Sequence, residues 1–164
     1  VRFAASLARS SGVKVILNPS PALPVSDEVL RSVSVLTPDA MQAEQLTGVR
    51  ITDERTAELA GRILLERGLD RVIITLRSSG AMVIDNGGAE HVPGYRSVPG
   101  NHTIMNDAFN GALAVALGEG NNFYQAVQFA NAAAALAATG SAHLPAFPLR
   151  SEILSFMKTA KSSH

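Results

Sequence analysis

Short apolar runs alternate with longer amphipathic stretches along the first half of the chain. Runs rich in β-branched residues occur at 13–17, 33–36 and 72–76, and the first two stop at turns that contain proline. The run at 72–76 is apolar on both faces, which is typical of a strand buried within a parallel sheet. Helical periodicity occupies the segments between them, at 1–9, 39–46 and 53–67.

The second half begins with a hairpin and continues as helices. Apolar runs at 81–85 and 89–92 flank Asn86-Gly87-Gly88, a sequence typical of a tight turn between antiparallel strands. Three helical patterns follow, at 104–117, 122–139 and 149–158. Strands that alternate with helices predict an α/β fold whose mostly parallel sheet is covered by helices on both faces. No internal repeat or linker interrupts the pattern, so we expect a single domain over residues 1–164.

Composition narrows the class of protein. The chain has 164 residues, 46% of them hydrophobic, with 14 basic and 14 acidic side chains, so it can bury a substantial core and is not expected to be disordered. Zero net charge provides no basic surface for nucleic acid, and the absence of cysteine excludes a disulfide scaffold. The most apolar stretch, 129–139, is shorter than the roughly 20 residues that a membrane span needs. Without a signal-peptide pattern at the first residues, we expect a cytoplasmic protein with no membrane partner.

Four loops are candidates for ligand binding. Ligands of open α/β sheets bind beyond the carboxyl ends of the strands, which selects 18–21, 37–42 and 76–80. A fourth loop, 99–107, leads into a helix whose free N–H groups and positive dipole end favour phosphate. Taken alone, none of these four loops is specific evidence of a binding site. Asp107, for example, has an ordinary structural interpretation, because an acidic residue in the first turn of a helix interacts favourably with the helix dipole.

Six sequence motifs, in order, give the chain a more specific resemblance. They lie at 16–22, 36–48, 72–80, 92–96, 107–113 and 129–135. Their order and spacing make the chain similar to the C-terminal, nucleotide-binding half of the ribokinase-like, or PfkB-type, carbohydrate kinases. The resemblance implies a three-layer α/β/α sheet, mostly parallel with one hairpin, that is truncated on its N-terminal side.

The resemblance also implies an activity and a set of site residues. Such kinases transfer the γ-phosphate of ATP to a sugar hydroxyl, and the carboxylate that removes the hydroxyl proton corresponds to Asp107. The N–H group of Asn106 corresponds to part of the anion hole for the transferring phosphate. The remaining positions that correspond to nucleotide-binding residues are Asp39, Thr75, Arg77, Ser78, Gly80 and Asn131. Asn131, which would lie near the adenine, is equally well interpreted as a polar residue satisfied inside an Ala-rich helix.

The motifs that handle phosphate depart from the family pattern. Arg77 stands where the family has glycine, and Ile104-Met105 replaces a pair of small residues. The glycine that precedes the base has become Asn106, a residue that tolerates the left-handed conformation better than most. These changes reduce the space in which backbone and phosphate approach one another.

The cation motifs depart as well. The family's Asn-x-x-Glu motif, which helps to hold Mg²⁺, is Asp39-Ala-Met-Gln42 here, so a carboxylate is missing at the implied magnesium position Gln42. The implied monovalent-cation site includes Asn101 and Thr103, and the family's aspartate is replaced at Asn101. K⁺ activation is therefore in doubt on chemical grounds.

Two functional hypotheses follow. The first is an ATP-dependent sugar kinase whose partners are a nucleotide and a sugar, impaired or inactive as this chain. The second is a pseudokinase or truncated remnant that binds nucleotide weakly or acts through assembly alone. Because the sugar-binding half of the family fold is missing, an apolar sheet edge or helix face should be uncovered, and we expect a homo-oligomer.

Overall fold

The computed structural model describes residues 1–95, 102–138 and 147–161, which fold as two compact units. The first unit consists of Val1–Leu76 and Met82–His91, and the second consists of Arg77–Ala81 and Val92–His164. Each unit is described here by itself. The prediction that residues 1–164 form a single domain stays a prediction.

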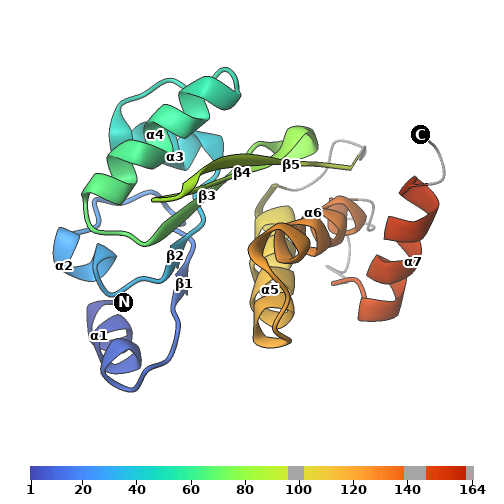
Figure 1. Cartoon of the computed structure of the whole chain (residues 1–164), viewed down its shortest axis with the longest axis horizontal. Helices are drawn as coiled ribbons and strands as arrows, with labels where there is room; N and C mark the ends of the chain where they lie inside the picture. Colours follow the sequence, from blue (N-terminus) through green and yellow to red (C-terminus); the bar gives the residue numbers. More distant parts are fainter. Residues whose placement is uncertain (96–101, 139–146, 162–164) are drawn as a thin grey trace. The chain divides into compact units, whose positions relative to one another are not determined.

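Five strands form one sheet in the order β1-β2-β3-β4-β5 (Figure 1). They are β1 (Ile16–Leu17), β2 (Val35–Leu36), β3 (Arg71–Thr75), β4 (Gly80–Asp85) and β5 (Gly88–Pro93). The first three strands are parallel, with Ile16 opposite Val35 and Leu36 opposite Val72. Strands β4 and β5 are joined by two residues, which allows antiparallel pairing and excludes a parallel crossover. The predicted α/β class, with a parallel part and one hairpin, is confirmed.

The first unit carries four helices, α1 (Arg2–Ser10), α2 (Asp27–Leu30), α3 (Ala40–Thr47) and α4 (Glu54–Glu66). Its core is built where the apolar face of α4 packs on β3. Ala57, Ala60 and Leu64, spaced three and four residues apart, are fully buried there together with Val72 and Ile74. The helical period of the sequence thus matches the buried face, as expected for an amphipathic helix on a sheet.

The ends of these helices follow local chemistry. Asp53 accepts a hydrogen bond from the Thr56 N–H at 2.8 Å and caps α4, and Asp39 caps α3 in the same way through the N–H of Gln42. Gly48 takes the left-handed conformation, φ 76°, that ends α3. Caps of this kind are readable from sequence because donor and acceptor lie three residues apart.

Some boundaries differ from the prediction. Strands β1 and β2 are two residues long, shorter than the predicted 13–17 and 33–36, since only the last part of each run lies in register with its neighbour. Helix α2 was not predicted, because four residues are too few to show helical periodicity. Helix α5 begins at His102, two residues before the predicted start.

The second unit contains the short 3₁₀ turn η1 (Arg77–Ser79) and three helices, α5 (His102–Gly118), α6 (Phe123–Ala138) and α7 (Arg150–Lys161). Helices α5 and α6 pack closely along one another. Small side chains allow this approach, because most of the alanines of α6 are buried, including Ala126, Ala130 and Ala133. No helix among the described residues is both long enough and apolar enough to cross a lipid bilayer.

Candidate functional site

In the first unit, the carboxyl ends of β2 and β3 bring two predicted site residues together. A single parallel bridge links Asp39 to Thr75, and the Thr75 N–H donates to the carbonyl of Pro38 at 3.0 Å. Both residues are partly exposed. The rule that ligands bind beyond the carboxyl ends of parallel strands therefore selects this edge, with Asp39 supplying a carboxylate there.

The predicted magnesium position Gln42 is engaged within the protein. Its side-chain oxygen Oε1 accepts from the Asp39 N–H at 2.9 Å and from Asn18 Nδ2 at 3.4 Å. The Gln42 N–H in turn donates to Asp39 Oδ1 at 2.8 Å, which completes a reciprocal capping box. Gln42 is only 8% exposed, so this amide stabilises the start of α3 and is turned away from solvent.

The described residues offer no ready-made metal site. No group of three or more His, Cys, Asp or Glu side chains converges in the ranges 1–95, 102–138 and 147–161. Mg²⁺ prefers several oxygen ligands, carboxylates above all, so Asp39 and Gln42 as arranged here do not fit that ion. The predicted monovalent-cation residue Asn101 lies outside the described residues. Thr103, the other predicted residue, is described only in its backbone, which belongs to α5.

In the second unit, the predicted phosphate segment forms a strained turn. Arg77 has a φ of 56°, the one positive φ among the described residues that are not glycine. This is the left-handed region, which an L-residue with a side chain adopts at a cost of roughly 1–2 kcal/mol. The Arg77 and Ser78 side chains are exposed. The backbone at Arg77 therefore takes a conformation that favours glycine, the residue that the resemblance predicts at this position.

Gly80 is required where this turn meets the end of β5. Its φ is 98°, and a Cβ placed on it would lie 2.1 Å from the carbonyl oxygen of Val92 and 2.4 Å from the nitrogen of Gly94. The Gly94 N–H donates to the Ser79 carbonyl at 3.3 Å, which joins the two segments. Gly80 therefore permits a close backbone crossing.

Asn131 has partners within the protein. Its Nδ2 donates to the carbonyl oxygens of Val92 and Pro93, both at 3.2 Å, and the residue is 8% exposed. A buried amide with satisfied donors fixes the end of β5 against α6. This geometry fits the second interpretation that the sequence left open, a polar residue satisfied inside the helix.

Asp107 is exposed and lies in the second turn of α5. Within this helix the N–H groups of residues 102–104 lie in the first turn and lack partners in the helical ladder. The N–H of Asn106 lies further along α5, opposite the carbonyl of His102 in the ladder. The Asn106 carbonyl accepts from Asn110 Nδ2 at 2.8 Å.

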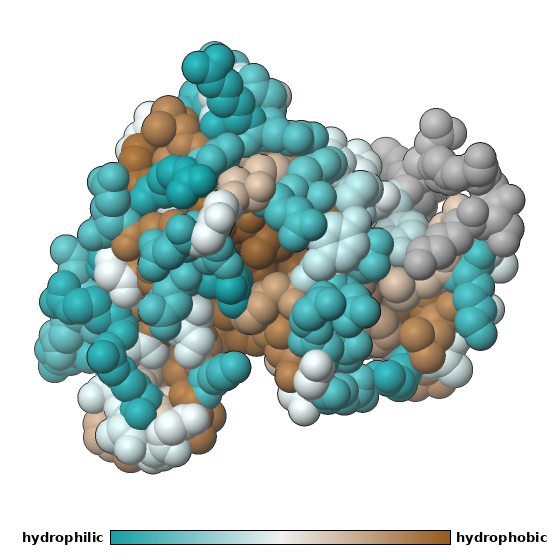
Figure 2. Space-filling model, viewed as in Figure 1, coloured by the Kyte–Doolittle hydropathy of each residue, from teal (hydrophilic) through white to brown (hydrophobic). Residues whose placement is uncertain are grey.

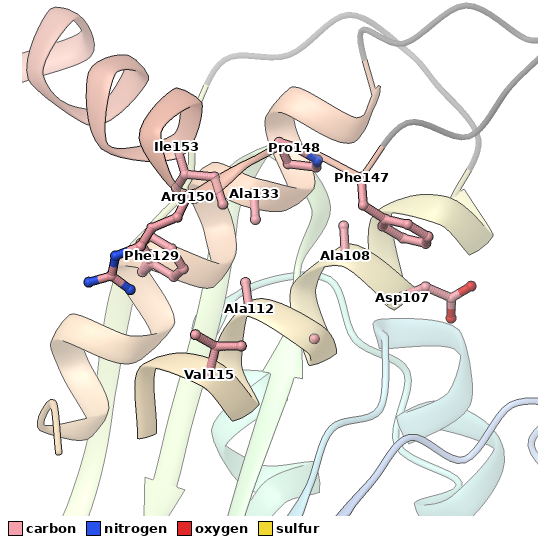
Figure 3. A pocket seen from close by; sticks show the side chains of 11 residues that line it. Asp107, Ala108, Ala112, Val115, Phe129, Ala133, Phe147, Pro148, Arg150 and Ile153 are labelled. Atoms are coloured by element: carbon pink, nitrogen blue, oxygen red, sulfur yellow. The ribbon is translucent and has the colours of Figure 1, made fainter. Parts of the chain in front are cut away.

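A cavity of about 350 Å³ extends along α5 from Asp107 (Figure 3). Its walls are mainly apolar and come from α5, α6 and the segment that starts α7, namely Ala108, Gly111, Ala112, Val115, Phe129, Ala133, Phe147, Pro148 and Ile153. Asp107 stands at one end of the cavity and Arg150 at the other, as Figure 3 shows. The volume suits a small organic molecule or a few side chains, and the walls carry few groups that bind phosphate.

Arg150 is held at its end of the cavity by two contacts. Its guanidinium donates to the Glu119 carboxylate, with Nη1 2.6 Å from Oε1, and its Cζ lies 5.6 Å from the centroid of the Phe129 ring. The second contact has the geometry of a cation–π interaction. Arg150 therefore lines the cavity beside the Phe129 ring.

Sequence reasoning found one residue of this cavity and missed the others. Asp107 lines it, whereas the predicted nucleotide-binding residues of the second unit, Arg77, Ser78, Gly80, Asn106 and Asn131, do not. The residues at 107, 111 and 115, spaced one helical turn apart, are a signal that was available in the sequence. Phe129 and Arg150 gave no comparable signal, because they meet across a long sequence separation.

Comparison with known proteins extends this description. A family model described as pfkB family carbohydrate kinase matches residues 1–145. The chain belongs to the pfkB family of carbohydrate kinases. The ribokinase of Haemophilus influenzae is 38% identical over 160 residues, which cover 98% of this chain and 52% of that protein. The ribokinase of Mus musculus is 38% identical over 114 residues, or 68% of this chain and 35% of that protein.

Solved structures of the family agree. The ribokinase of Thermotoga maritima superposes with a TM-score of 0.82 at 31% identity, covering 94% of this chain and 52% of that one. The Arabidopsis thaliana ribokinase complexed with ribose and ATP gives a TM-score of 0.83 at 27% identity, covering 96% and 51%. The predicted ribokinase-like fold is confirmed. The chain spans about half the length of the curated relatives it matches.

Proposed function

We propose that this chain is the part of an ATP-dependent sugar kinase that carries the catalytic base, and that the chain alone is impaired in catalysis. The observation that carries the proposal is the position of Asp107, an exposed carboxylate at the mouth of a cavity in a chain of the pfkB family. A base must come within hydrogen-bond reach of the proton that it removes, and an exposed carboxylate on a rigid helix is available for this.

The proposed reaction is a transfer of phosphate from ATP to a sugar. The Asp107 carboxylate accepts the proton of the sugar hydroxyl while that oxygen bonds to the γ-phosphorus, and the bond from phosphorus to the ADP oxygen breaks. Support for ATP and ribose as substrates comes from the relative in Arabidopsis thaliana, whose structure holds both. No step is assigned to Mg²⁺ or K⁺; among the described residues no group of three or more His, Cys, Asp or Glu side chains converges.

Several features support impairment of the isolated chain. Arg77 places a side chain where close backbone approach to phosphate is expected, and the Asn131 amide is already bonded to backbone carbonyls. Residues 1–164 also match only about half of the Haemophilus influenzae relative, so by themselves they supply part of the polypeptide that would exclude water from the reaction. Exclusion of water is a large part of how such sites work, so turnover by residues 1–164 alone should be slow.

The same observations favour a second candidate, a non-catalytic member of the family. In this alternative the Arg77 side chain blocks the phosphate segment, and the chain acts through assembly with itself or another polypeptide. We infer that the two candidates differ first in ADP release that depends on Asp107, because a pseudokinase of this kind binds nucleotide only weakly or acts through assembly alone.

Two measurements test the proposal. Isothermal titration calorimetry of the 164-residue chain with MgATP should show binding with a Kd of about 1 mM or tighter, equivalent to about −4 kcal/mol. Ribose-dependent ADP release should then appear when the chain is joined to the part of Haemophilus influenzae ribokinase that it does not match. Asp107→Asn should lower that rate by about 10²-fold or more, because a general base contributes on that order.

Asp70→Asn is the matched control, since Asp70 is an exposed aspartate of the first unit, and its rate should equal that of the unchanged hybrid. Absence of heat at several millimolar MgATP would support the non-catalytic candidate. Equal ADP release with Asp107→Asn would contradict the assignment of the base.

A further inference from the structure

A cavity of about 440 Å³ lies within the first unit. Its walls come from the ends of α1, α2 and α4 and from the segments that lead from them into β1, β2 and β3. Each segment enters a parallel strand at its amino end, whereas Asp39 and Thr75 lie at the carboxyl ends of β2 and β3. We call this space the amino-end cavity, because it lies at the opposite end of the strands from those two residues.

Three cationic side chains line the amino-end cavity, those of Arg9, Lys14 and Arg31, and all three residues are exposed. Among the described residues, none of the three forms an ion pair with a carboxylate. By contrast, Arg67 of the same unit pairs with Asp27 at 2.9 Å. Figure 2 shows a mostly hydrophilic surface in the region where Figure 1 places α2, the helix that Arg31 follows.

Contacts within the protein position the two arginines. Arg9 donates from Nη1 to the backbone carbonyl of Arg31 and so joins α1 to the end of α2. The stem of Arg31 lies over Gly68, because a Cβ placed on that glycine would be 2.6 Å from Arg31 Cγ. A bond to a neutral carbonyl leaves the charge of a guanidinium uncompensated and leaves other N–H groups of its fork able to donate.

The charge of the amino-end cavity is positive in balance. The carboxyl ends of α1 and α4 each bring about half a negative charge to this side of the unit, which favours the cations that gather there. Asp70, which also lines the cavity, adds one carboxylate. The three cations exceed these negative contributions, so the cavity attracts an anion.

Hydroxyl groups complete the donor set. Ser32 and Ser34 line the same cavity. Ser34 Oγ accepts from the Val15 N–H at 3.1 Å, and among the described residues its own proton has no acceptor. Guanidinium, ammonium and hydroxyl donors together match the several acceptor oxygens of a phosphoryl group.

We propose that the amino-end cavity binds a small phosphorylated molecule with at least two negative charges, held through its phosphoryl oxygens by Arg9, Lys14 and Arg31. The volume of about 440 Å³ is within the usual size of small-molecule sites. Free polyphosphates and phosphate esters share this chemistry. The proposal goes beyond the proposed kinase function and does not depend on it, because the cavity lies away from Asp39 and Thr75 in the first unit.

Nuclear magnetic resonance of the 164-residue chain tests the site, with inorganic pyrophosphate as the probe. The amide resonances of Gly12, Ser34 and Asp70, which line the cavity, should shift with a Kd of about 1 mM or tighter. A parallel titration with glycerol 3-phosphate should shift the same resonances. The probe with the lower Kd identifies free polyphosphates or esters as the source of the ligand.

Substitutions test the cations one at a time. Lys14→Gln and Arg31→Gln should each raise the Kd for pyrophosphate about tenfold, because each removes a charged donor. Arg55→Gln is the matched control, since Arg55 is also exposed but lies in the first turn of α4, at the end of that helix away from the cavity. Its Kd should equal that of the unchanged chain. Resonances outside the cavity should keep their positions in all three variants, which shows that the variants fold.

Three results would overturn the proposal. The first is that the resonances of the cavity stay in place at about 10 mM of either probe, well above the expected Kd. The second is an equal loss of affinity in Arg55→Gln and Arg31→Gln. The third is the loss of Lys14-dependent pyrophosphate binding, measured by calorimetry, when the chain is joined to the unmatched part of Haemophilus influenzae ribokinase. The proposed kinase function fails separately, through the Asp107→Asn assay.

Discussion

Arg77 takes a backbone conformation that favours glycine although it carries a long side chain. Its φ of 56° lies in the left-handed region, where glycine pays no steric cost. Arg77→Gly should therefore raise the free energy of unfolding by about 0.5–1 kcal/mol, less than the full left-handed penalty because glycine also loses more backbone entropy on folding. Urea denaturation followed by circular dichroism measures the change.

Arg77→Ala is the control for that substitution, since it removes the guanidinium but keeps the Cβ. It should leave the stability nearly unchanged, whereas an equal gain from alanine and glycine would show that backbone strain is not the cause. If the side chain blocks phosphate, Arg77→Gly should also tighten the binding of MgATP in calorimetry.

Two glycines of the second unit should respond in opposite directions to alanine. Gly80→Ala places a Cβ 2.1 Å from the Val92 carbonyl oxygen at a φ of 98°, so we expect a loss of about 3 kcal/mol or more. Gly111 lies inside α5 with open space around it, and Gly111→Ala should stabilise the chain by about 0.5–1 kcal/mol through helix propensity. Thermal unfolding measures both, and a small loss at Gly80 would show that the crossing of the two segments can relax.

At the scale of elements, an ion pair links β3 to β4. Arg71 Nε donates to Asp85 Oδ2 at 3.1 Å, and both side chains are about one quarter exposed. The hydrogen bond from Arg71 is the main reason that the pKa of Asp85 lies below its ordinary value of 3.8. Partial burial of the carboxylate raises the pKa and opposes this, while a smaller contribution from the Gly87 N–H lowers it further. Because the folded pKa is the lower one, the pair contributes stability above pH 4 and loses it as the pH falls through the folded pKa.

Asp85→Asn should remove this dependence on pH. The unchanged chain should lose urea resistance as the pH is lowered from 5 to 3, and the variant, weaker at pH 7, should lose less over the same interval. Urea midpoints at pH 7, 5, 4 and 3 measure the difference. Glu90→Gln on β5 is a suitable control, since its side chain is exposed and the acid-dependent loss should remain as in the unchanged chain. Parallel pH profiles for the unchanged chain and Asp85→Asn would contradict the role of the pair.

At the scale of the whole molecule, exposed apolar side chains bear on behaviour in solution, among them Phe3 and Leu7 of α1, which are 81% and 54% exposed. In the absence of another partner, exposed apolar side chains associate with one another, so the isolated chain should form concentration-dependent homo-oligomers, as the sequence predicts. Sedimentation velocity at chain concentrations from about 5 to 200 µM should show a sedimentation coefficient that rises with concentration. This range covers self-association with a Kd in the micromolar range. Leu7→Asp should weaken this association, and Leu59→Asp should not. A chain that remains monomeric over the whole range would contradict the prediction.

The division between sequence and structure is clearest at particular residues. The elements, the α/β class and the family could be predicted, because apolar periods, caps such as Asp53 and the ordered motifs are properties of residues close together in the chain. The predicted positions Asp39 and Thr75 do come together, since the ends of parallel strands meet at one sheet edge. The two-residue lengths of β1 and β2 could not be predicted, because register depends on the neighbouring strand.

The sequence by itself determined the family, pfkB, over a stretch that spans about half the length of the relatives it matches, with a carboxylate at Asp107. Tertiary structure alone decided what several site residues do. It bonded the Asn131 amide to two carbonyls near position 92, and it placed Phe129 and Arg150 along a cavity with Asp107. Among the described strands it placed β1 at one end of the sheet order. These features depend on groups brought together from distant parts of the chain, and partners of that kind leave no local pattern for the sequence to show.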